Sequence, residues 1–235
     1  MSMSSVAEQW VNDAAALTAP SRTEWCDGSK AEYDRLIEAM LRDGTLLAAL
    51  LTVTVWKFLT GGVHLDGLAD CLDGLVGRDA EHRLAIMRDS RIGAFGAVGL
   101  ILFLMLEIVA LAELVPPVRG SALFAAPVIA RATPAVLAAL FRPARADGQG
   151  AAFHAGVRPS AIAIGLAAAA AAASFALGGL GVATLSVGLV AAVAVGAFVA
   201  TRLGGVTGDV LGAAVEISEV AVLLTVSAWT YAARV

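Results

Sequence analysis

The chain has few residues that carry charge or form cross-links. Only 15% of its 235 residues are charged, 6% are aromatic, and the two cysteines are Cys26 and Cys71. Two cysteines without metal-ligand spacing exclude a disulfide framework and a thiolate metal site. The lack of a basic tail excludes the usual nucleic-acid-binding proteins. The polar N-terminal region has no apolar segment of the kind found in a secretory signal peptide.

Long uncharged runs are abundant instead. Hydrophobic residues make up 59% of the chain, and its mean hydropathy is +0.81. Pro159–Thr201 contains 43 residues and no charge. Since a helix crosses the hydrocarbon core with about 20 residues, this run holds two spans, with a glycine turn at 178–181. The sequence therefore predicts an all-α, polytopic membrane helical bundle with spans at about 45–62, 94–115, 121–141, 160–178, 182–201 and 211–231.

Arginine is distributed unevenly over the loops between these spans. The loops at 63–93 and 142–159 contain seven of the arginines and Arg202 follows on the same side, whereas the opposite side contains only Arg119. The positive-inside rule places the arginine-rich loops in the cytoplasm. The protein is thus expected in the cell inner (cytoplasmic) membrane, in contact with lipid.

A dense polar block, Gly61–Gly96, separates the first two apolar segments. Asp66, Asp70 and Asp73 stand at i, i+4 and i+7, which places them on one face of a helix. Repulsion between three carboxylates is relieved by a divalent cation, and oxygen ligands favour Mg²⁺ bound together with substrate phosphates. The alternative is a solvated acidic helix face. Nearby side chains suited to phosphate oxygens are Arg78, Arg83, Arg88 and Arg91.

Two further segments on the predicted cytoplasmic side carry polar residues. Gly204–Glu219 contains Thr207, with Asp209 and Glu216 two helical turns apart, and Pro143–Gly150 contains Arg145 and Asp147 in a flexible turn. Each is either a part of the site or an ordinary loop.

Arg131 lies near the middle of an otherwise apolar predicted span. An ionisable group at this depth is costly and indicates function. Its partner is either an acidic group of a substrate or Glu107 on the preceding span, and in the second case the pair is structural.

Three motifs, in order, resemble the signature of the cobalamin synthase family, the adenosylcobinamide-GDP ribazoletransferases. They are TGGVHLDGLAD at 60–70 followed by Asp73-Gly74, IMRDSRIG at 86–93, and TGDVLGA at 207–213. Ala144-Arg145 is similar to a further loop of that family, and the resemblance covers about residues 47–235. It implies transfer of the cobinamide phosphate moiety from adenosylcobinamide-GDP to α-ribazole (or its phosphate), with release of GMP and a requirement for Mg²⁺.

The resemblance also implies roles for individual residues. The metal ligands would be Asp66, Asp70, Asp73 and Asp209. The catalytic residues would be His64, Asp89 and Arg91, with His64 as the general base. The residues that bind the substrate phosphates would be Arg88, Arg91, Arg131, Arg145 and Thr207. A homo-oligomer is compatible with this pattern. The chain departs from the family at Pro143, where tyrosine is expected, at Gln149, where an apolar residue is expected, and at Glu107, where lysine is expected.

Residues 6–46 resemble a different family, the GTP-type phosphoenolpyruvate carboxykinases, at their extreme N-terminus. The resemblance rests on VAEQWV, WCDGS and EYDRL at 6–11, 25–29 and 32–36. The chain lacks the glycine–lysine loop of a carboxykinase, so that activity is not expected. We predict a foreign N-terminal arm over 1–46, with short helices at 5–18 and 29–43, joined to a membrane domain over 47–235.

Three other functions compete with this interpretation. A CDP-alcohol phosphotransferase also uses clustered aspartates, but its signature has an Ala-Arg step that Asp66–Asp70 lacks. A transporter would use Asp70, Arg131 and Glu107 as a buried relay, and it is disfavoured because the polar groups gather at one membrane face. An inactive, truncated membrane protein is the third, because the first apolar spans expected of the family are missing.

Overall fold

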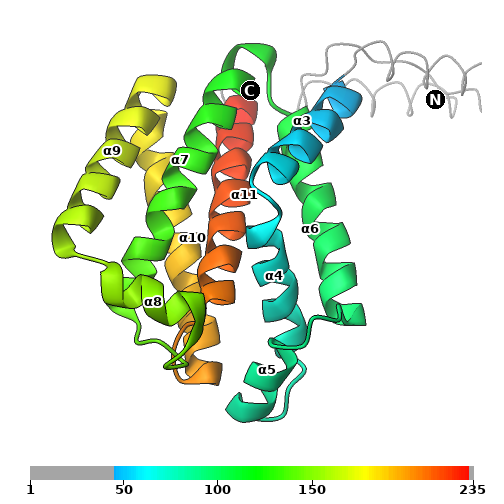
Figure 1. The fold of residues 1–235 in the computed structure, drawn as a ribbon. Helices are drawn as coiled ribbons and strands as arrows, with labels where there is room; N and C mark the ends of the chain where they lie inside the picture. The colour runs from blue at the N-terminus through cyan, green and yellow to red at the C-terminus, as the bar shows by residue number, and fades with distance from the viewer. Residues whose placement is uncertain (1–44, 233–235) are drawn as a thin grey trace, which may run out of the picture.

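The computed structural model describes residues 45–232, and all of its regular elements are helices (Figure 1). A single isolated bridge joins Pro143 to Val206 within these residues. The helices are α3 Thr45–Leu59, α4 Val63–Gly74, α5 Ala80–Ile86, α6 Ala94–Ala112, α7 Pro116–Leu140, α8 Gly148–Gly156, α9 Pro159–Leu177, α10 Leu180–Leu203 and α11 Gly208–Ala232. The predicted N-terminal arm and its two short helices lie outside the described residues.

Five helices are long and apolar enough to span a membrane: α6, α7, α9, α10 and α11. The pair α3 and α4 would be a sixth, broken span, bent by 93°. The prediction of an all-α, multi-pass membrane protein is therefore confirmed. The predicted breaks are confirmed as well, since α7 begins at Pro116 and Gly178, with φ of 59°, ends α9.

The C-terminal helix α11 forms the centre of the bundle. It packs against α10, α4 and α7. In its most apolar stretch of 18 residues 72% is buried, compared with 11% in the same stretch of α9. Two apolar cores form along it: one includes Leu111, Ile129 and Leu223, and the other includes Leu137, Val210 and Leu203. Residues at the start of α11 therefore sit on the best-supported element of the fold.

The bend between α3 and α4 brings the aspartate motif against this central helix. Gly61 and Gly62 have φ of 68° and 66°, a left-handed conformation that glycine adopts without strain. The chain thus turns sharply, and α4 lies between α11 and α6 (Figure 1).

Charged side chains form a cluster inside the bundle, which the sequence analysis did not foresee. Lys57 lies 2.7 Å from Glu216, 2.8 Å from Glu219 and 3.0 Å from Glu107, and all four residues are buried. Arg131 binds Glu219 at 2.6 Å. The alternative of an Arg131–Glu107 pair is therefore wrong, because Lys57 reaches Glu107 from α3 while Arg131 faces Glu219 on α11. The expectation that polar groups gather only at one membrane face is wrong for the same reason.

Candidate functional site

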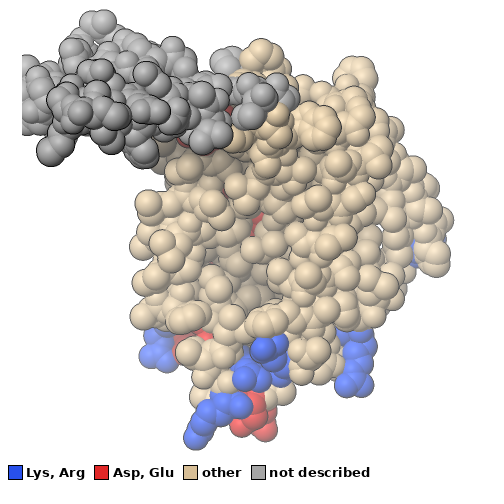
Figure 2. Space-filling model, turned by 180° about the vertical axis from the view of Figure 1, so that it is seen from behind, with Lys and Arg blue, Asp and Glu red and all other residues tan. Residues whose placement is uncertain are grey.

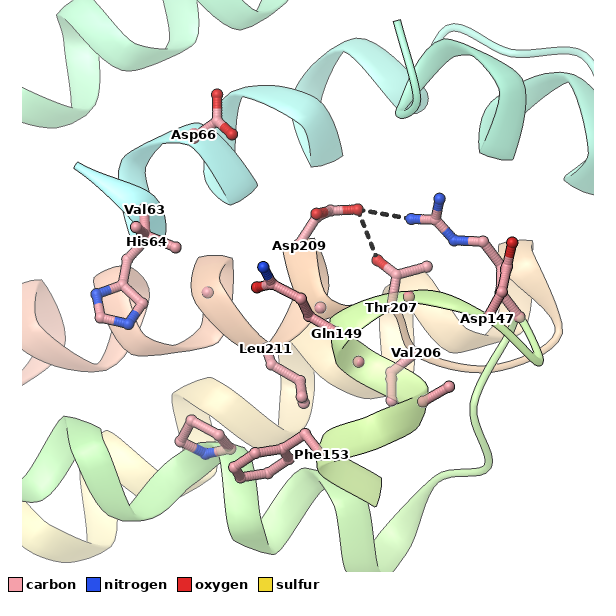
Figure 3. Close-up of a pocket in the computed structure, with 17 residues that line it drawn as sticks. Val63, His64, Asp66, Asp147, Gln149, Phe153, Val206, Thr207, Asp209 and Leu211 are labelled. Atoms are coloured by element: carbon pink, nitrogen blue, oxygen red, sulfur yellow. Dashed lines mark hydrogen bonds and ion pairs between the residues drawn. The ribbon is translucent and has the colours of Figure 1, made fainter. Parts of the chain in front are cut away.

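A cavity of about 590 Å³ lies at the end of the bundle where α8 sits, between the beginnings of three helices (Figure 3). Its wall contains His64 and Asp66 from the first turn of α4, and Thr207 and Asp209 at the start of α11. The first turn of α8 supplies the third side with Gly148–Gly150. In Figure 2, lysine and arginine side chains gather at this same end of the molecule.

Three helix N-termini thus border one cavity. The first N–H groups of a helix have no partner within that helix, and the peptide dipoles add a partial positive charge there. A diphosphate or other anion is favoured at such a position. Arg145, which also lines the cavity, adds a full positive charge.

Glycine permits the close approach of these helix starts. A Cβ on Gly150 would lie 2.4 Å from the main-chain nitrogen of Gly208, so α8 and α11 touch at their first turns. A Cβ on Gly67 would lie 2.7 Å from the main-chain oxygen of Asp209, so α4 meets α11 in the same way. Larger residues at either contact would push the helices apart.

Arg145 is held in place by Asp209. Its Nη2 donates to Asp209 Oδ2 at 2.8 Å, and Thr207 Oγ1 donates to the same oxygen at 3.1 Å (Figure 3). The loop that carries Arg145 is fixed by two backbone hydrogen bonds, Ala144 N–H to Val206 O and Val206 N–H to Arg142 O. The guanidinium is mostly buried, at 18% exposure, so its charge faces the cavity region rather than bulk water.

His64 occupies the opposite wall, on α4. It is half-buried, and within the described part of the chain its Nδ1 has no hydrogen-bond partner. An imidazole without a fixed partner at a cavity wall is suited to accept or donate a proton.

Five of the residues predicted from sequence line this cavity: His64, Asp66, Arg145, Thr207 and Asp209. The structure therefore brings together residues that lie up to 145 positions apart in the sequence. The other predicted residues lie outside the lining, and their surroundings differ.

Asp73 has a structural environment. Its Oδ2 accepts the N–H of Gly93 and its Oδ1 the N–H of Gly96, both at 2.7 Å, and the residue is buried. It therefore caps the beginning of α6 with two charge-assisted hydrogen bonds. Asp70 lies one turn earlier on α4, half-buried, and outside the cavity lining.

Asp89 and Arg91 bind each other on the surface. The Arg91 Nε donates to Asp89 Oδ1 at 2.9 Å, and the Arg91 side chain is 86% exposed. The hydrogen bonds from Arg91 lower the pKa of Asp89 to about 2, so Asp89 stays ionised and is a weak base at neutral pH.

Arg88 reaches the cavity edge through Asp147. Its Nη2 donates to Asp147 Oδ1 at 2.9 Å and to Oδ2 at 3.1 Å, and both side chains are exposed. Asp147 lines the cavity, so this pair bridges the loop after α5 and the start of α8. Arg131, whose side chain is 38% exposed, binds the buried Glu219 instead.

Sequence reasoning placed Asp147 beside Arg145 in a polar turn without giving it a role, and it did not select Gln149, Phe153 or Pro134, although all four line the cavity. Gln149 gave one signal, since it stands where an apolar residue is expected. Phe153 and Pro134 gave none, because a cavity formed by loops and helix ends has no periodic pattern.

The donor set fits Mg²⁺ held jointly with substrate oxygens. Within residues 45–232, no three histidine, cysteine or carboxylate side chains lie close enough to hold a metal ion by themselves. Mg²⁺ is usually bound by one or two carboxylates plus phosphate and water. Asp66 and Asp209 supply two carboxylates to this cavity.

Comparison with known proteins identifies the family. The cobalamin-5-phosphate synthase family matches residues 34–227. The chain belongs to this family. The adenosylcobinamide-GDP ribazoletransferase of Brevibacillus brevis is 41% identical over 187 residues, covering 78% of this chain and 76% of that protein. The enzymes of the same name from Escherichia coli O139:H28 and Shigella boydii serotype 18 are each 42% identical, over 77% of this chain and 75% of theirs.

A second match falls at the N-terminus. Residues 9–58 are similar to the N-terminal domain of phosphoenolpyruvate carboxykinase, and this match overlaps the first by residues 34–58. The resemblance noted from the sequence is confirmed, while the predicted boundary at 46–47 stays a prediction. No solved structure is significantly similar to the chain.

Proposed function

We propose that this membrane protein transfers the cobinamide phosphate moiety of adenosylcobinamide-GDP to α-ribazole or its phosphate. GMP leaves and a cobalamin (or its phosphate) forms. The observation that carries this proposal is the cavity at which three helix N-termini, Arg145 and two carboxylates meet, in a member of the cobalamin-5-phosphate synthase family.

The chemistry is the attack of a ribazole hydroxyl oxygen on the cobinamide-linked phosphorus. The phosphoanhydride bond to GMP breaks, and the hydroxyl proton has to be removed. His64, which lines the cavity, would take that proton. Arg145 and the N–H groups at the start of α8 and α11 stabilise the negative charge that builds up on the phosphoryl oxygens.

Asp209 has two tasks in this proposal. Its Oδ2 fixes the Arg145 guanidinium, as the 2.8 Å contact indicates. Its remaining oxygen and the exposed Asp66 carboxylate across the cavity would hold Mg²⁺. When bound, Mg²⁺ would neutralise diphosphate charge and orient the leaving GMP.

The orientation in the membrane follows from charge. The cavity lies at the end that carries Arg83, Arg88, Arg142 and Arg202, whereas Arg119 lies at the opposite end of α7. The positive-inside rule favours a cytoplasmic-membrane protein with the cavity open to the cytoplasm, where GMP is released. An apolar bundle would also accommodate a bulky, amphiphilic corrinoid at the membrane surface.

The test is cobalamin formation by membranes that contain the chain, supplied with adenosylcobinamide-GDP, α-ribazole and Mg²⁺. We expect product with the parent chain, at least a hundredfold less with Asp209→Asn, and an unchanged rate with Glu81→Gln. Glu81 is an exposed carboxylate on α5, so it is a matched control for loss of one charge. Absence of product from membranes in which the chain is correctly inserted would refute the proposal.

A further inference from the structure

The buried charge cluster connects three helices through one ammonium group and a fourth through Arg131. Lys57 on α3 contacts Glu216 and Glu219 on α11 and Glu107 on α6, at 2.7, 2.8 and 3.0 Å. Arg131 on α7 completes the cluster by binding the second oxygen of Glu219. Ion pairs of this kind are weak evidence for stability, because desolvation offsets much of the attraction. Their geometry is strictly defined, however, and they suit a role in fixing the position of an element.

Lys57 is also part of the elbow between α3 and α4. Its carbonyl oxygen accepts the N–H of Gly62 and the hydroxyl of Thr60, both at 3.0 Å. The next side chain, Phe58, is 82% exposed and gives the elbow no support from the bundle. The ammonium of Lys57 therefore ties the elbow to the central helix α11, about two turns along from Asp209.

The first turn of α4 follows the elbow directly and carries three cavity residues, among them His64 and Asp66. His64 packs with its backbone against α11, where a Cβ on Gly212 would lie 3.3 Å from the His64 Cα. Asp66 follows on the same turn. A shift of the elbow would thus move His64 and Asp66 relative to Asp209 on α11.

We propose that Lys57 is a positioning residue for the transfer reaction. Its ammonium holds the elbow at α11, and the elbow sets where His64 and Asp66 stand in the cavity. Lys57 lies outside the cavity lining, and the backbone of the elbow connects it to the cavity residues.

The competing explanation is charge balance alone. The cluster has three carboxylates and two cations, Lys57 and Arg131, a formal charge of −1. Lys57→Met leaves three carboxylates and one cation, which makes any loss of function ambiguous. The double variant Lys57→Met/Glu107→Met keeps the formal charge at −1 and removes the ammonium contacts to α11 and α6. It therefore separates positioning from charge balance.

The kinetic measurement depends on the proposed transfer reaction. We expect the double variant to accumulate in membranes as the parent does, with kcat lowered by about 10- to 100-fold and KM for α-ribazole changed by less than about threefold. Lys57→Arg, which keeps a cation at this position, should restore most of kcat. Parent-like kcat in the double variant would overturn the proposal. Its absence from the membrane would do the same, because the cluster would then serve folding.

A distance measurement does not depend on any activity. Val76, just after α4, and Thr201, near the end of α10, are exposed and would carry spin labels as cysteines in a Cys26→Ser/Cys71→Ala background. The label distance should shift or broaden in the double variant and stay parental in Lys57→Arg. A parental distance in the double variant would refute the positioning role even if the protein proves to catalyse another reaction. A shifted distance without product would refute only the proposed function.

Discussion

Gly67→Ala is the change that probes most directly the contact on which the cavity depends. A Cβ at this position would lie 2.7 Å from the main-chain oxygen of Asp209 and 3.0 Å from its Cα. Ordinary contact begins at about 3.4 Å, so the overlap is about 0.7 Å. Both neighbours are backbone atoms of the central helix, and they cannot move aside as a flexible side chain would.

The overlap has to be relieved by a movement of α4 away from α11. Overpacking of this kind costs about 1–3 kcal/mol in a well-packed interior. The same movement separates Asp66 from Asp209, and a displacement of about 1 Å can lower a rate by about a hundredfold. We therefore expect Gly67→Ala to lose activity more than it loses stability.

The assay compares ribazole transfer with thermal unfolding in detergent. Gly165→Ala is the matched control, because Gly165 lies within α9 and a Cβ there would meet no other atom within 4 Å. The control should retain full activity and unfold at the parental temperature or above, since alanine favours helix over glycine by roughly 0.5–1 kcal/mol. Parental rate and stability in Gly67→Ala would show that the α4–α11 contact is not as close as the structure describes.

Three further substitutions test single contacts. Asp73→Asn should lower the unfolding temperature, because it weakens the two charge-assisted hydrogen bonds to the start of α6. The expected loss of stability is about 1–2 kcal/mol, measured by thermal unfolding. The dependence of the transfer rate on Mg²⁺ should stay unchanged. Arg145→Lys should reduce kcat by about tenfold or more in the transfer assay, with normal abundance in the membrane. The planar guanidinium of arginine can donate to Asp209 and to a phosphoryl oxygen at the same time, and the ammonium of lysine cannot take both positions. Asp89→Asn should leave the pH–rate profile unchanged between about pH 5 and pH 9, because Arg91 keeps the folded-state pKa of Asp89 near 2 and the group does not titrate there; a shifted acid limb would contradict this reasoning.

The membrane spans could be predicted from the sequence because hydropathy is a local property. The uncharged run at 159–201 and its glycine turn became α9 and α10 almost residue for residue. The Lys57 cluster could not be predicted in this way. Lysine and glutamate in apolar segments each signal a cost, but their pairing depends on which helices face one another. The sequence offered Glu107 as one of two possible partners of Arg131 because it lies on the preceding span, but in the folded protein Lys57 binds Glu107 and Arg131 binds Glu219.

The aspartate motif shows why spacing on one helix does not define one site. Asp66, Asp70 and Asp73 share a face of α4, as predicted, but α4 lies between two helices, and Asp66 and Asp73 have different surroundings. Asp66 lines the cavity, while Asp73, two turns on, meets the N–H groups at the start of α6. Neighbouring carboxylates can be stabilised either by a bound cation or by backbone N–H donors. The spacing of the aspartates in the sequence does not show which of the two is present. The motif therefore combines a cavity residue with a helix cap, and replacing each aspartate separately should separate loss of catalysis from loss of stability.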